Sequence, residues 1–399
     1  MNADSDRLPL EGIRVIDVSQ VMAGPFACML LGDLGADVIK VEPPTGDQTR
    51  SSMGFKLQGD DSLGFINLNR NKRSIVLDLK AEEDRNVFFE LSKTADVIIE
   101  NYRPGVMKKL GIDYDAISKI NPKIIYASIS GFGQTGPWWK RPGFDLMAQA
   151  ASGVMSITGH PDSPPAKSGA PLADIGCALF TVYAVLSAFI GREKSGKGQY
   201  IDASLYEAGL SFAIWDICNY WGTGTIPERT GTANQMAAPY QAVRAKDGYF
   251  VLGANNDRMF AKLCDLLDRS DLVDHPDYST NALRLKNRIA LIEELETVLL
   301  TRTREDWVET LLAAGIPAGS IQDYSEALGN PHAEAREMVM PIDHPVEGRV
   351  NNIGFPVKLR GTPQQVRRHP PLLNEHRDEI LAELGLGPSG KEANNVRSA

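Results

Sequence analysis

The sequence predicts an α/β protein with a mostly parallel sheet, followed by a smaller α+β domain. Over the first 205 residues, short apolar runs alternate with amphipathic stretches. The chain is 399 residues long, which is more than one ordinary domain needs. After Trp221 the amino-acid composition changes. The segment GTGTIPERTGTANQMAAPY is rich in Gly, Pro and Thr, which is typical of a linker.

Six short runs rich in apolar residues predict buried strands at 13–18, 37–41, 74–79, 96–100, 123–130 and 199–203. Helical periodicity predicts one helix over 25–34, ended by Gly35, and another over 82–94. Strands that alternate with helices at these spacings imply βαβ crossovers and a sheet covered on both faces.

A long apolar helix is expected over 174–192, with the sequence DIGCALFTVYAVLSAFIGR. Its pattern is too interrupted for a membrane span, and we expect a buried central helix.

Beyond the linker, a strand is expected at 249–253 and helices at 257–267, 288–301 and 304–314. The pattern at 340–357 predicts extended chain, and LLNEHRDEILAELGLG predicts an amphipathic helix near the end. The chain therefore divides into a large domain over 1–220, a linker over 221–240, a small α+β domain over 241–321 and a final segment over 322–399.

Composition excludes several classes of protein. The formal net charge of −9 argues against a nucleic-acid-binding protein, which carries a basic footprint. The four cysteines and six histidines lack the paired spacing of a zinc or redox site. The N-terminal MNADSDRLPL resembles neither a secretory signal nor a transit peptide. We expect a cytoplasmic protein whose partners include no nucleic acid and no membrane.

Nucleotide-binding signatures are incomplete. The segment from Gly191 to Lys197 has P-loop spacing, but Gly198 stands where Ser or Thr would bind magnesium. The turn after the first strand lacks the three glycines of a dinucleotide fingerprint. The sequence also holds neither a G-x-S-x-G nor an H-E-x-x-H motif. A dehydrogenase, an ATPase, a serine hydrolase and a zinc protease are therefore poorly supported.

Five ordered strings carry a resemblance: RVIDVSQVMAGPFACMLLGDLGADVIKVEPPTGDQTR, NRNKRSIVLDLK, ADVIIENYRPGVMKKLGI, IIYASISGFGQTGP and PLADIGCALF. Together they resemble the class III CoA-transferases (CaiB/BaiF type), which include formyl-CoA:oxalate and carnitine CoA-transferases. The similarity continues through GKGQYIDASLYEA and GIPAGSI, and so covers nearly the whole chain. The strings PYQAVRAKDGY and YSTNALRLKNR look most like the succinyl-CoA:dicarboxylate (glutarate-type) branch.

The resemblance implies a large Rossmann-like domain built from both chain ends, with the smaller domain inserted between them. The segment 322–399 would then be a linker and a return to the large domain with a C-terminal helix. Family members form interlocked homodimers, so a homodimer is expected. The implied activity moves CoA from an acyl-CoA, taken as succinyl-CoA, to a dicarboxylate. Coenzyme A thioesters would be substrates, and no prosthetic group is expected.

By resemblance, Asp174 is the catalytic nucleophile, which forms acyl anhydrides and an aspartyl-CoA thioester in turn. Asp174 opens the long apolar helix, and the helix N-terminus should favour its negative charge. The residue pattern alone favours an Asp that only caps the helix, and the resemblance reverses this preference. The two roles do not exclude each other.

Coenzyme A contacts implied by the resemblance fall on the first βα turn, the L-D-x-K strand end and the N-[FY]-x-P-G turn: Ala23, Leu77, Lys80, Asn101, Tyr102, Val106 and Lys109. Lysines at loop edges can meet phosphates, and a tyrosine ring offers adenine a flat surface. Judged singly, a lysine is usually a surface charge, and the tyrosine could be a half-buried packing residue. Two departures are Met22 and Pro43, where the oxalate branch has Gln and Arg.

Arg70, in the basic run NRNKR, is the candidate for holding a free carboxylate of the substrate, since its planar fork suits bidentate recognition. An ordinary charged strand start is the alternative. The oxalate enzymes close a glycine-rich loop over their intermediates. The corresponding Gly253-Ala-Asn-Asn256 has one glycine, which suggests a tighter lid.

Two other functions remain open on this scaffold. An α-methylacyl-CoA racemase would need a histidine in an R-x-G-H-D string, and this chain has Phe144 there. Phenylalanine cannot carry a proton, which disfavours a two-base mechanism. A catalytically silent acyl-CoA-binding protein is the other alternative, disfavoured by the intact Asp174 motif. A formyl-CoA:oxalate-type transferase remains open within the family.

Overall fold

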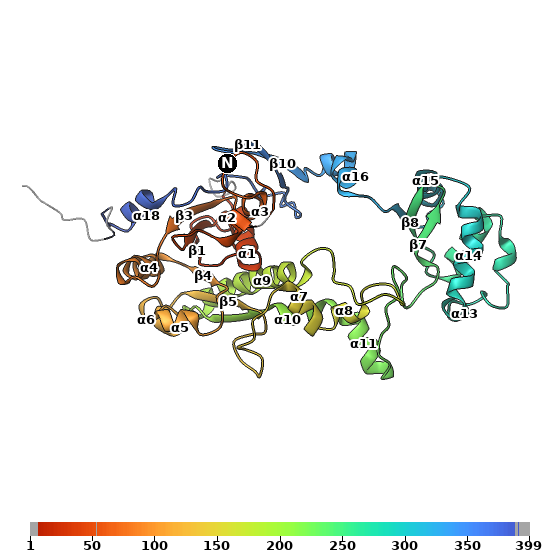
Figure 1. The fold of residues 1–399 in the computed structure, drawn as a ribbon, viewed down its shortest axis with the longest axis horizontal. Coiled ribbons are helices and arrows are strands. Elements are labelled where there is room, and N and C mark those ends of the chain that lie inside the picture. The colour runs from red at the N-terminus through yellow and green to blue at the C-terminus, as the bar shows by residue number, and fades with distance from the viewer. Residues whose placement is uncertain (1–6, 53, 388–389, 391–399) are drawn as a thin grey trace, which may run out of the picture. The chain divides into compact units, whose positions relative to one another are not determined.

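The computed structural model describes residues 7–52, 54–387 and 390 (Figure 1). The chain forms two compact units. Unit 1 comprises Met1–Val154, Ser168–Ile217 and His332–Ala399, and unit 2 comprises Met155–Lys167 and Cys218–Pro331. Residues 155–167, assigned to the large domain from the sequence, thus belong to unit 2.

Unit 1 is built on a six-stranded parallel sheet with the order β3-β2-β1-β4-β5-β6. Its strands are β1 (Arg14–Asp17), β2 (Asp37–Glu42), β3 (Lys72–Val76), β4 (Val97–Glu100), β5 (Ile125–Ser130) and β6 (Tyr200–Ser204). This is the strand order of dinucleotide-binding folds, in which the order of the strands reverses between β1 and β4. The predicted α/β class with a parallel sheet is confirmed.

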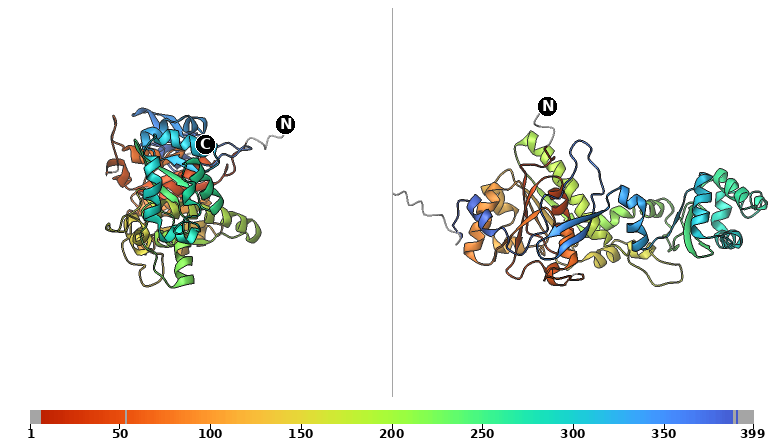
Figure 2. Two further views of the ribbon diagram at one scale, coloured as in Figure 1. Left: turned by 90° about the vertical axis from the view of Figure 1, so that its right-hand side faces the viewer. Right: turned by 90° about the horizontal axis from the view of Figure 1, so that it is seen from above.

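Helices cover both faces of this sheet, as Figures 1 and 2 show. One apolar core joins the sheet to α1 (Ala23–Asp33), α9 (Leu172–Ser195) and α10 (Leu205–Phe212). A second core, on the opposite face, joins it to α4 (Glu82–Thr94), α5 (Val106–Leu110), α6 (Tyr114–Ile120) and α18 (Arg377–Glu383). Burial on both faces explains the apolar residues at the middle of the two central strands, Val15 and Ile16 in β1 and residues 97–99 in β4.

The remaining elements of unit 1 are short: α2 (Gln48–Ser52), α3 (Leu63–Leu68), α7 (Asp145–Ala151), β10 (Val339–His344) and β11 (Gly348–Ile353). The strands β10 and β11 pair as an antiparallel hairpin. The C-terminal segment returns to the main sheet, where the N–H of His376 donates to the carbonyl of Ser74 at 3.0 Å.

The edge strand β3 begins two residues earlier than predicted, because its first residues are buried charges. Lys72 is fully buried and pairs with Asp17 at 2.7 Å. Arg73 pairs with Asp37 and with Glu383. A sequence pattern that counts Lys and Arg as exposed places the strand start too late.

The helix α9 differs from its prediction in two ways. It begins at Leu172 and its N-cap is Pro171, so the alternative interpretation of Asp174 as an N-cap is wrong. One of its faces is exposed and apolar, including Leu179, Phe180 and Tyr183. The expectation of a fully buried helix is therefore wrong for this face. Among the described residues, α9 is long and apolar enough to span a membrane, and 44% of its most apolar window is buried.

Unit 2 contains a three-stranded antiparallel sheet of β7 (Tyr240–Ala245), β8 (Gly248–Gly253) and β9 (Ala318–Ser320). Its helical elements are α12 (Asp257–Leu266), η1 (Ser270–Leu272), α13 (Asn281–Lys286), α14 (Arg288–Leu299), α15 (Arg304–Ala313) and α16 (Tyr324–Gly329). One apolar core, which includes Phe250, Leu295 and Trp307, joins α12, η1, α14 and α15 to the sheet. Three helices cross the chain boundaries between units: α8 (Val154–Ile157), α11 (Ile214–Thr223) and α17 (Pro331–Ala335).

Candidate active site

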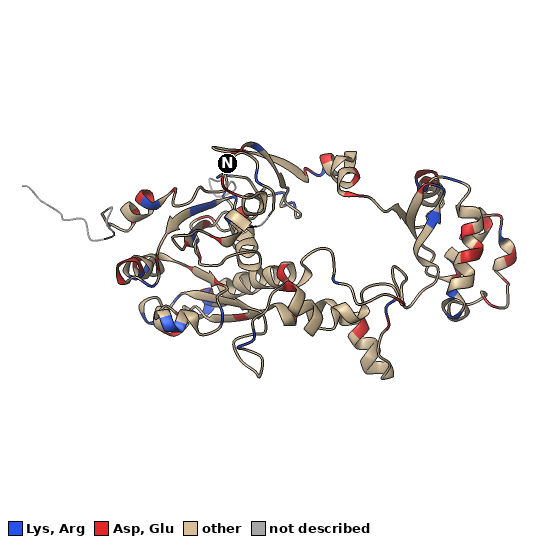
Figure 3. Ribbon diagram, viewed as in Figure 1, with Lys and Arg blue, Asp and Glu red and all other residues tan. Residues whose placement is uncertain are grey.

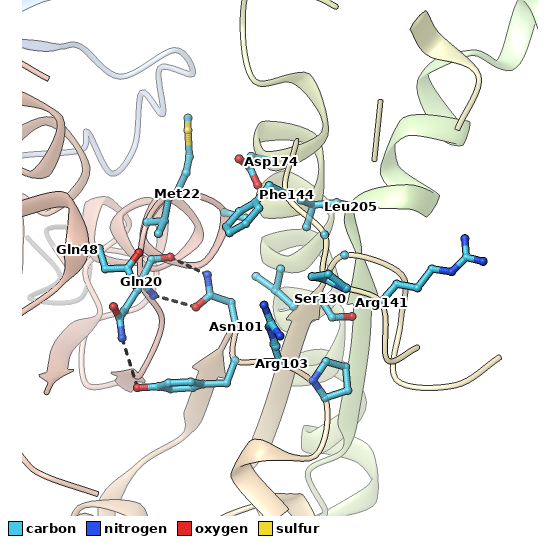
Figure 4. Close-up of a pocket in the computed structure, with 18 residues that line it drawn as sticks. Gln20, Met22, Gln48, Asn101, Arg103, Ser130, Arg141, Phe144, Asp174 and Leu205 are labelled. Carbon is cyan, nitrogen blue, oxygen red and sulfur yellow. Dashed lines mark hydrogen bonds between the residues drawn. The ribbon is translucent and has the colours of Figure 1, made fainter. Parts of the chain in front are cut away.

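Unit 1 holds a cavity of about 340 Å³ at the carboxyl ends of β1, β4 and β5 (Figure 4). It is lined by Gln20, Val21, Met22, Ala23, Gln48, Asn101, Tyr102, Arg103, Pro104, Ile129, Ser130, Gly131, Arg141, Pro142, Gly143, Phe144, Asp174 and Leu205. The strands β1 and β4 are the neighbours between which the sheet order reverses. Parallel α/β sheets bind their ligands at this point.

The turns after β1 and β4 are fastened to each other. Asn101 and Gln20 exchange two hydrogen bonds, and the Gln20 amide reaches the Tyr102 hydroxyl at 3.5 Å. These bonds are drawn in Figure 4. The buried carboxylate of Glu100 accepts the N–H of Tyr102 at 2.8 Å. Burial raises the pKa of Glu100 to about 7.

Buried charges support the turn after β1. The ammonium of Lys40 donates to the carbonyl of Ser19 at 2.9 Å and pairs with Asp47 at 2.8 Å. The carboxylate of Asp47 also accepts the N–H of Val21. Val21 has a φ of 69°, a left-handed conformation that is costly for a β-branched residue. The charges beneath the turn hold this strained residue in the cavity wall.

The opposite wall depends on two glycines. A Cβ placed on Gly131 would lie 2.7 Å from the Cα of Gly143, so a side chain there would collide with backbone. Their close approach brings the loop before α7 against the end of β5. Phe144 follows Gly143 and presents its ring to the cavity.

Asp174 is the third residue of α9 and lies in the cavity lining, half-buried. Among the described residues, no side chain or backbone group donates a hydrogen bond to its carboxylate. Burial, followed by the negative charge of Asp145, raises the pKa of Asp174 to about 7. Burial and the charge of Asp145 thus outweigh the stabilisation expected from the helix N-terminus. The N–H groups of Ala173 and Asp174 are already bound by Asp145.

Comparison with known proteins shows to which family the chain belongs. The sequence profile of CoA-transferase family III matches residues 10–377. The chain belongs to CoA-transferase family III. The human succinyl-CoA:glutarate CoA-transferase is 38% identical over 377 residues, which cover 94% of this chain and 86% of that protein.

Two further relatives of this CoA-transferase are similar at comparable identity. The acetyl-CoA:oxalate CoA-transferase of Acetobacter aceti is 41% identical over 355 residues, covering 88% of this chain and 90% of that protein. The crystal structure of a CAIB/BAIF family protein from Brucella suis superposes with a TM-score of 0.85 at 39% identity, covering 95% of this chain and 100% of that one. The predicted family and the predicted enzyme class are confirmed.

The structure brings together four of the residues proposed from the sequence: Ala23, Asn101, Tyr102 and Asp174. Four others lie outside the cavity lining: Leu77, Lys80, Val106 and Lys109. Leu77 is buried in the second core of unit 1. Lys80 and Lys109 are exposed, and the basic end of α5 is visible in Figure 3. The contacts of these four residues with coenzyme A remain predictions.

Arg70 lies outside the cavity of this CoA-transferase. It is 2% exposed, and two nitrogens of its guanidinium donate to the carboxylate of Asp33, with the shorter bond at 2.6 Å. Its remaining terminal nitrogen donates to Asn352 and to the carbonyl of Ile353. The assignment of Arg70 to a substrate carboxylate is therefore corrected, since its hydrogen-bonding groups are committed to the protein interior.

Several lining residues were missed from the sequence, above all Gln20, Arg103 and Arg141. Their positions could have revealed two of them, because Gln20 follows β1 and Arg103 follows β4, and parallel sheets bind ligands at the carboxyl ends of their strands. Within the described part of the chain, no group of three or more His, Cys, Asp or Glu residues could hold a metal ion. The cavity lining itself offers a carboxylate, amides, guanidinium groups and apolar side chains.

Proposed function

We propose that this enzyme moves CoA from succinyl-CoA to a dicarboxylic acid, through anhydride and aspartyl-CoA thioester intermediates on Asp174. The observation that carries the proposal is the carboxylate of Asp174 in the cavity, with no hydrogen bond from a described residue. Ala23, Asn101 and Tyr102 line the same cavity and are proposed to hold coenzyme A.

The proposed reaction has four steps. The Asp174 carboxylate attacks the donor thioester, which forms an anhydride and releases CoA thiolate. The thiolate attacks the aspartyl carbonyl, which gives an aspartyl-CoA thioester and releases the donor acid. The acceptor carboxylate attacks this thioester, forms a second anhydride and releases the thiolate again. The thiolate attacks the acceptor carbonyl, so the new acyl-CoA leaves and the aspartate is restored.

The surroundings of Asp174 suit a nucleophile. A carboxylate is a weak nucleophile when water or hydrogen-bond donors stabilise it, and burial removes part of that stabilisation. Its pKa of about 7 means that the reactive anion forms near neutral pH. The apolar side chains of Met22, Phe144 and Leu205 line the cavity with it.

A dicarboxylate acceptor is supported by relatives and by the lining. The human relative carries the name succinyl-CoA:glutarate CoA-transferase. Met22 lines the cavity, and its thioether suits the methylene groups of a C4–C6 acid better than the two carboxylates of oxalate. Oxalate is the second candidate acceptor, because the Acetobacter aceti relative is named for it.

A racemase has less support. The described lining contains no histidine, and Phe144 stands where the proton-transferring histidine would be. Asp174 would then be one base without its partner. A silent acyl-CoA-binding protein would not need a partly buried carboxylate in its cavity.

A homodimer in the cytoplasm is part of the proposal. Phe180 of α9 stacks on Phe212 of α10 with ring centroids 6.0 Å apart, and both rings are exposed, as is Tyr183. A second copy of the chain would cover such an apolar surface. The cysteines are free thiols, as a reducing compartment allows. Light scattering on the purified protein should give twice the chain mass.

The test of the function uses Asp174→Ala with succinyl-CoA and glutarate. The variant should bind acyl-CoA but form no glutaryl-CoA by mass spectrometry. Hydroxylamine added during turnover should modify Asp174 of the wild type, because an aspartyl anhydride or thioester is its target. An alanine variant that retained substantial activity would overturn the covalent mechanism.

A further inference from the structure

Asp145, the first residue of α7, caps a helix other than its own. Its Oδ1 accepts the backbone N–H of Ala173 at 2.8 Å and that of Asp174 at 3.3 Å. These groups belong to the first turn of α9, whose own N-cap, Pro171, provides no side-chain cap. The carboxylate of Asp145 therefore fills the place of the missing N-cap from 28 residues away in the chain.

A buried amide holds Asp145 in this position. The other oxygen of Asp145 accepts the side-chain N–H of Gln149 at 2.6 Å. Gln149 is fully buried, and its carbonyl oxygen accepts the N–H of Ser168 at 2.9 Å. The amide thus fixes the rotamer of Asp145 and ties it to the segment that leads into α9.

This arrangement has a consequence for Asp174. The positive end of a helix normally stabilises a carboxylate in its first turn. In α9 the nearest N–H groups are bound by Asp145 instead, and Asp174 projects into the cavity with no donor among the described residues (Figure 4). The backbone of Asp174 is held, while its carboxylate is left unstabilised.

Resting on the proposed role of Asp174 as nucleophile, we propose that Asp145 is a positioning residue for the reaction. By capping α9 from α7, it fixes the backbone of Asp174, directs the carboxylate to the cavity and denies it the stabilisation of the helix N-terminus.

The charged and titratable groups around Asp174 make the proposal testable by pH. The charge that acts on Asp174 itself is that of Asp145 from α7. Cys177, on the next turn of α9, is affected by the charges of Asp174, of Glu207 from α10 and of Asp202 from β6. Arg103 and Arg141 lie in the cavity loops. Burial is the first cause of the raised pKa of Asp174, and the charge of Asp145 is the second. Loss of that charge should therefore lower the pKa of Asp174 while leaving it above its usual value.

The experiment compares Asp145→Asn with Asp145→Ala in the full-length enzyme, using the pH profile of kcat/KM for succinyl-CoA. The asparagine keeps an acceptor for the two N–H groups but has no charge, so the acidic limb of its profile should move to lower pH. The alanine removes the cap as well, so its kcat should fall about 10- to 100-fold through misplacement of the nucleophile, with little change in KM.

The matched control is Asp323→Ala in unit 2. The carboxylate of Asp323 also caps a helix, since it accepts the N–H groups of Ser325 and Glu326. This variant loses a cap of the same chemistry outside the cavity, so it should keep the wild-type kcat and pH profile. A fall in kcat equal to that of Asp145→Ala would mean that any lost cap impairs the enzyme, and would overturn the proposal.

Two other results separate failure of this proposal from failure of the proposed function. If Asp174→Ala is inactive but Asp145→Asn has an unmoved acidic limb, Asp174 is the nucleophile and Asp145 does not position it. If Asp174→Ala is active, the covalent mechanism itself fails. Should Asp145→Ala not fold, the pH profile of Asp145→Asn alone decides, because it retains the cap.

Discussion

Gln20 and Asn101 join the two central strand ends of the sheet through a reciprocal pair of hydrogen bonds. The N–H of Gln20 donates to Asn101 Oδ1 at 2.8 Å, and Asn101 Nδ2 donates to the carbonyl of Gln20 at 2.7 Å. Because β1 and β4 are neighbours at the point where the strand order reverses, this pair sets the distance between two walls of the cavity. Only a side chain with both a donor and an acceptor can complete it.

We therefore predict that Asn101→Asp will weaken the binding of acyl-CoA. The carboxylate has no donor for the carbonyl of Gln20 and faces it with a second acceptor. Loss of one or two such bonds corresponds to a rise of about tenfold in the KM for succinyl-CoA. Steady-state kinetics measure it, with Asn86→Asp on the exposed side of α4 as the control for added charge. An unchanged KM would show that the pair does not shape the site.

Arg70→Ala should lower the stability of the folded protein and leave its preference among acceptor acids unchanged. It would leave Asp33 buried without its partner, which costs about 3–5 kcal/mol of unfolding free energy. Arg70→Lys should recover part of this, because an ammonium cannot make the fork. Urea denaturation measures the loss. If Arg70→Ala were fully stable and lost only dicarboxylate turnover, the original assignment of Arg70 to substrate would be restored.

Local sequence patterns predicted the helices and strands of the sheet domain, because the residues that determine each element lie close together in the chain. The helix α4 has the predicted bounds, 82–94, and β2 differs by one residue. Both depend on apolar periodicity and end residues that a short window contains. The parallel arrangement followed from alternation alone, since helical connections between strands permit little else.

Buried charges could not be predicted in the same way. Lys72 lies 55 residues from Asp17, and no local pattern distinguishes such a pair from two surface charges. The site shows the same limit. Asp174 was found through resemblance, but its surroundings were not, because Asp145, 29 residues away, accepts the N–H groups at the start of α9. Interactions distant in sequence decided the environment of the nucleophile.

Asp174→Asn should stabilise the protein at high pH. The folded-state pKa of Asp174 is about 7 against a usual 3.8, so between these values the folded protein keeps a proton that the unfolded chain has lost. Wild-type stability therefore falls as pH rises through this window. At pH 8 the variant should be more stable by about 2–4 kcal/mol, and near pH 4 the difference should disappear. Urea unfolding across this range checks it, and a variant no more stable at pH 8 would contradict the raised pKa.

The wild type should not exchange the α-proton of a 2-methylacyl-CoA. Phe144 lines the cavity where a racemase would need a proton carrier, and its ring cannot act as acid or base. Incubation in deuterated water followed by mass spectrometry should show deuterium incorporation at background level. Rapid exchange would mean that another group serves as the base, and the distinction based on Phe144 would be lost.

The last prediction concerns the charge that selects dicarboxylates, for which Arg70 is no longer a candidate. In the described cavity lining the cations are Arg103 and Arg141. The guanidinium of Arg141 stacks over Trp138 at 4.4 Å, and its side chain points away from Asp174 in Figure 4. Arg103 is exposed beside Asn101 and forms no ion pair with another described residue. We therefore expect Arg103 to hold the distal carboxylate of a C4–C6 acid.

Arg103→Ala should reduce kcat/KM about 10- to 100-fold for succinate and glutarate, the equivalent of a lost charge-assisted hydrogen bond. Matched monocarboxylates of the same length should be almost unaffected, because they present no second charge. Arg103→Lys should restore part of the loss, and Arg141→Ala should leave the preference intact. Kinetics with a donor that lacks a distal carboxylate, such as acetyl-CoA, isolate the acceptor side. An equal fall in kcat/KM for dicarboxylates and monocarboxylates would mean that Arg103 binds coenzyme A instead. The phosphates of the acyl-CoA donor are present in both reactions, whichever acid accepts.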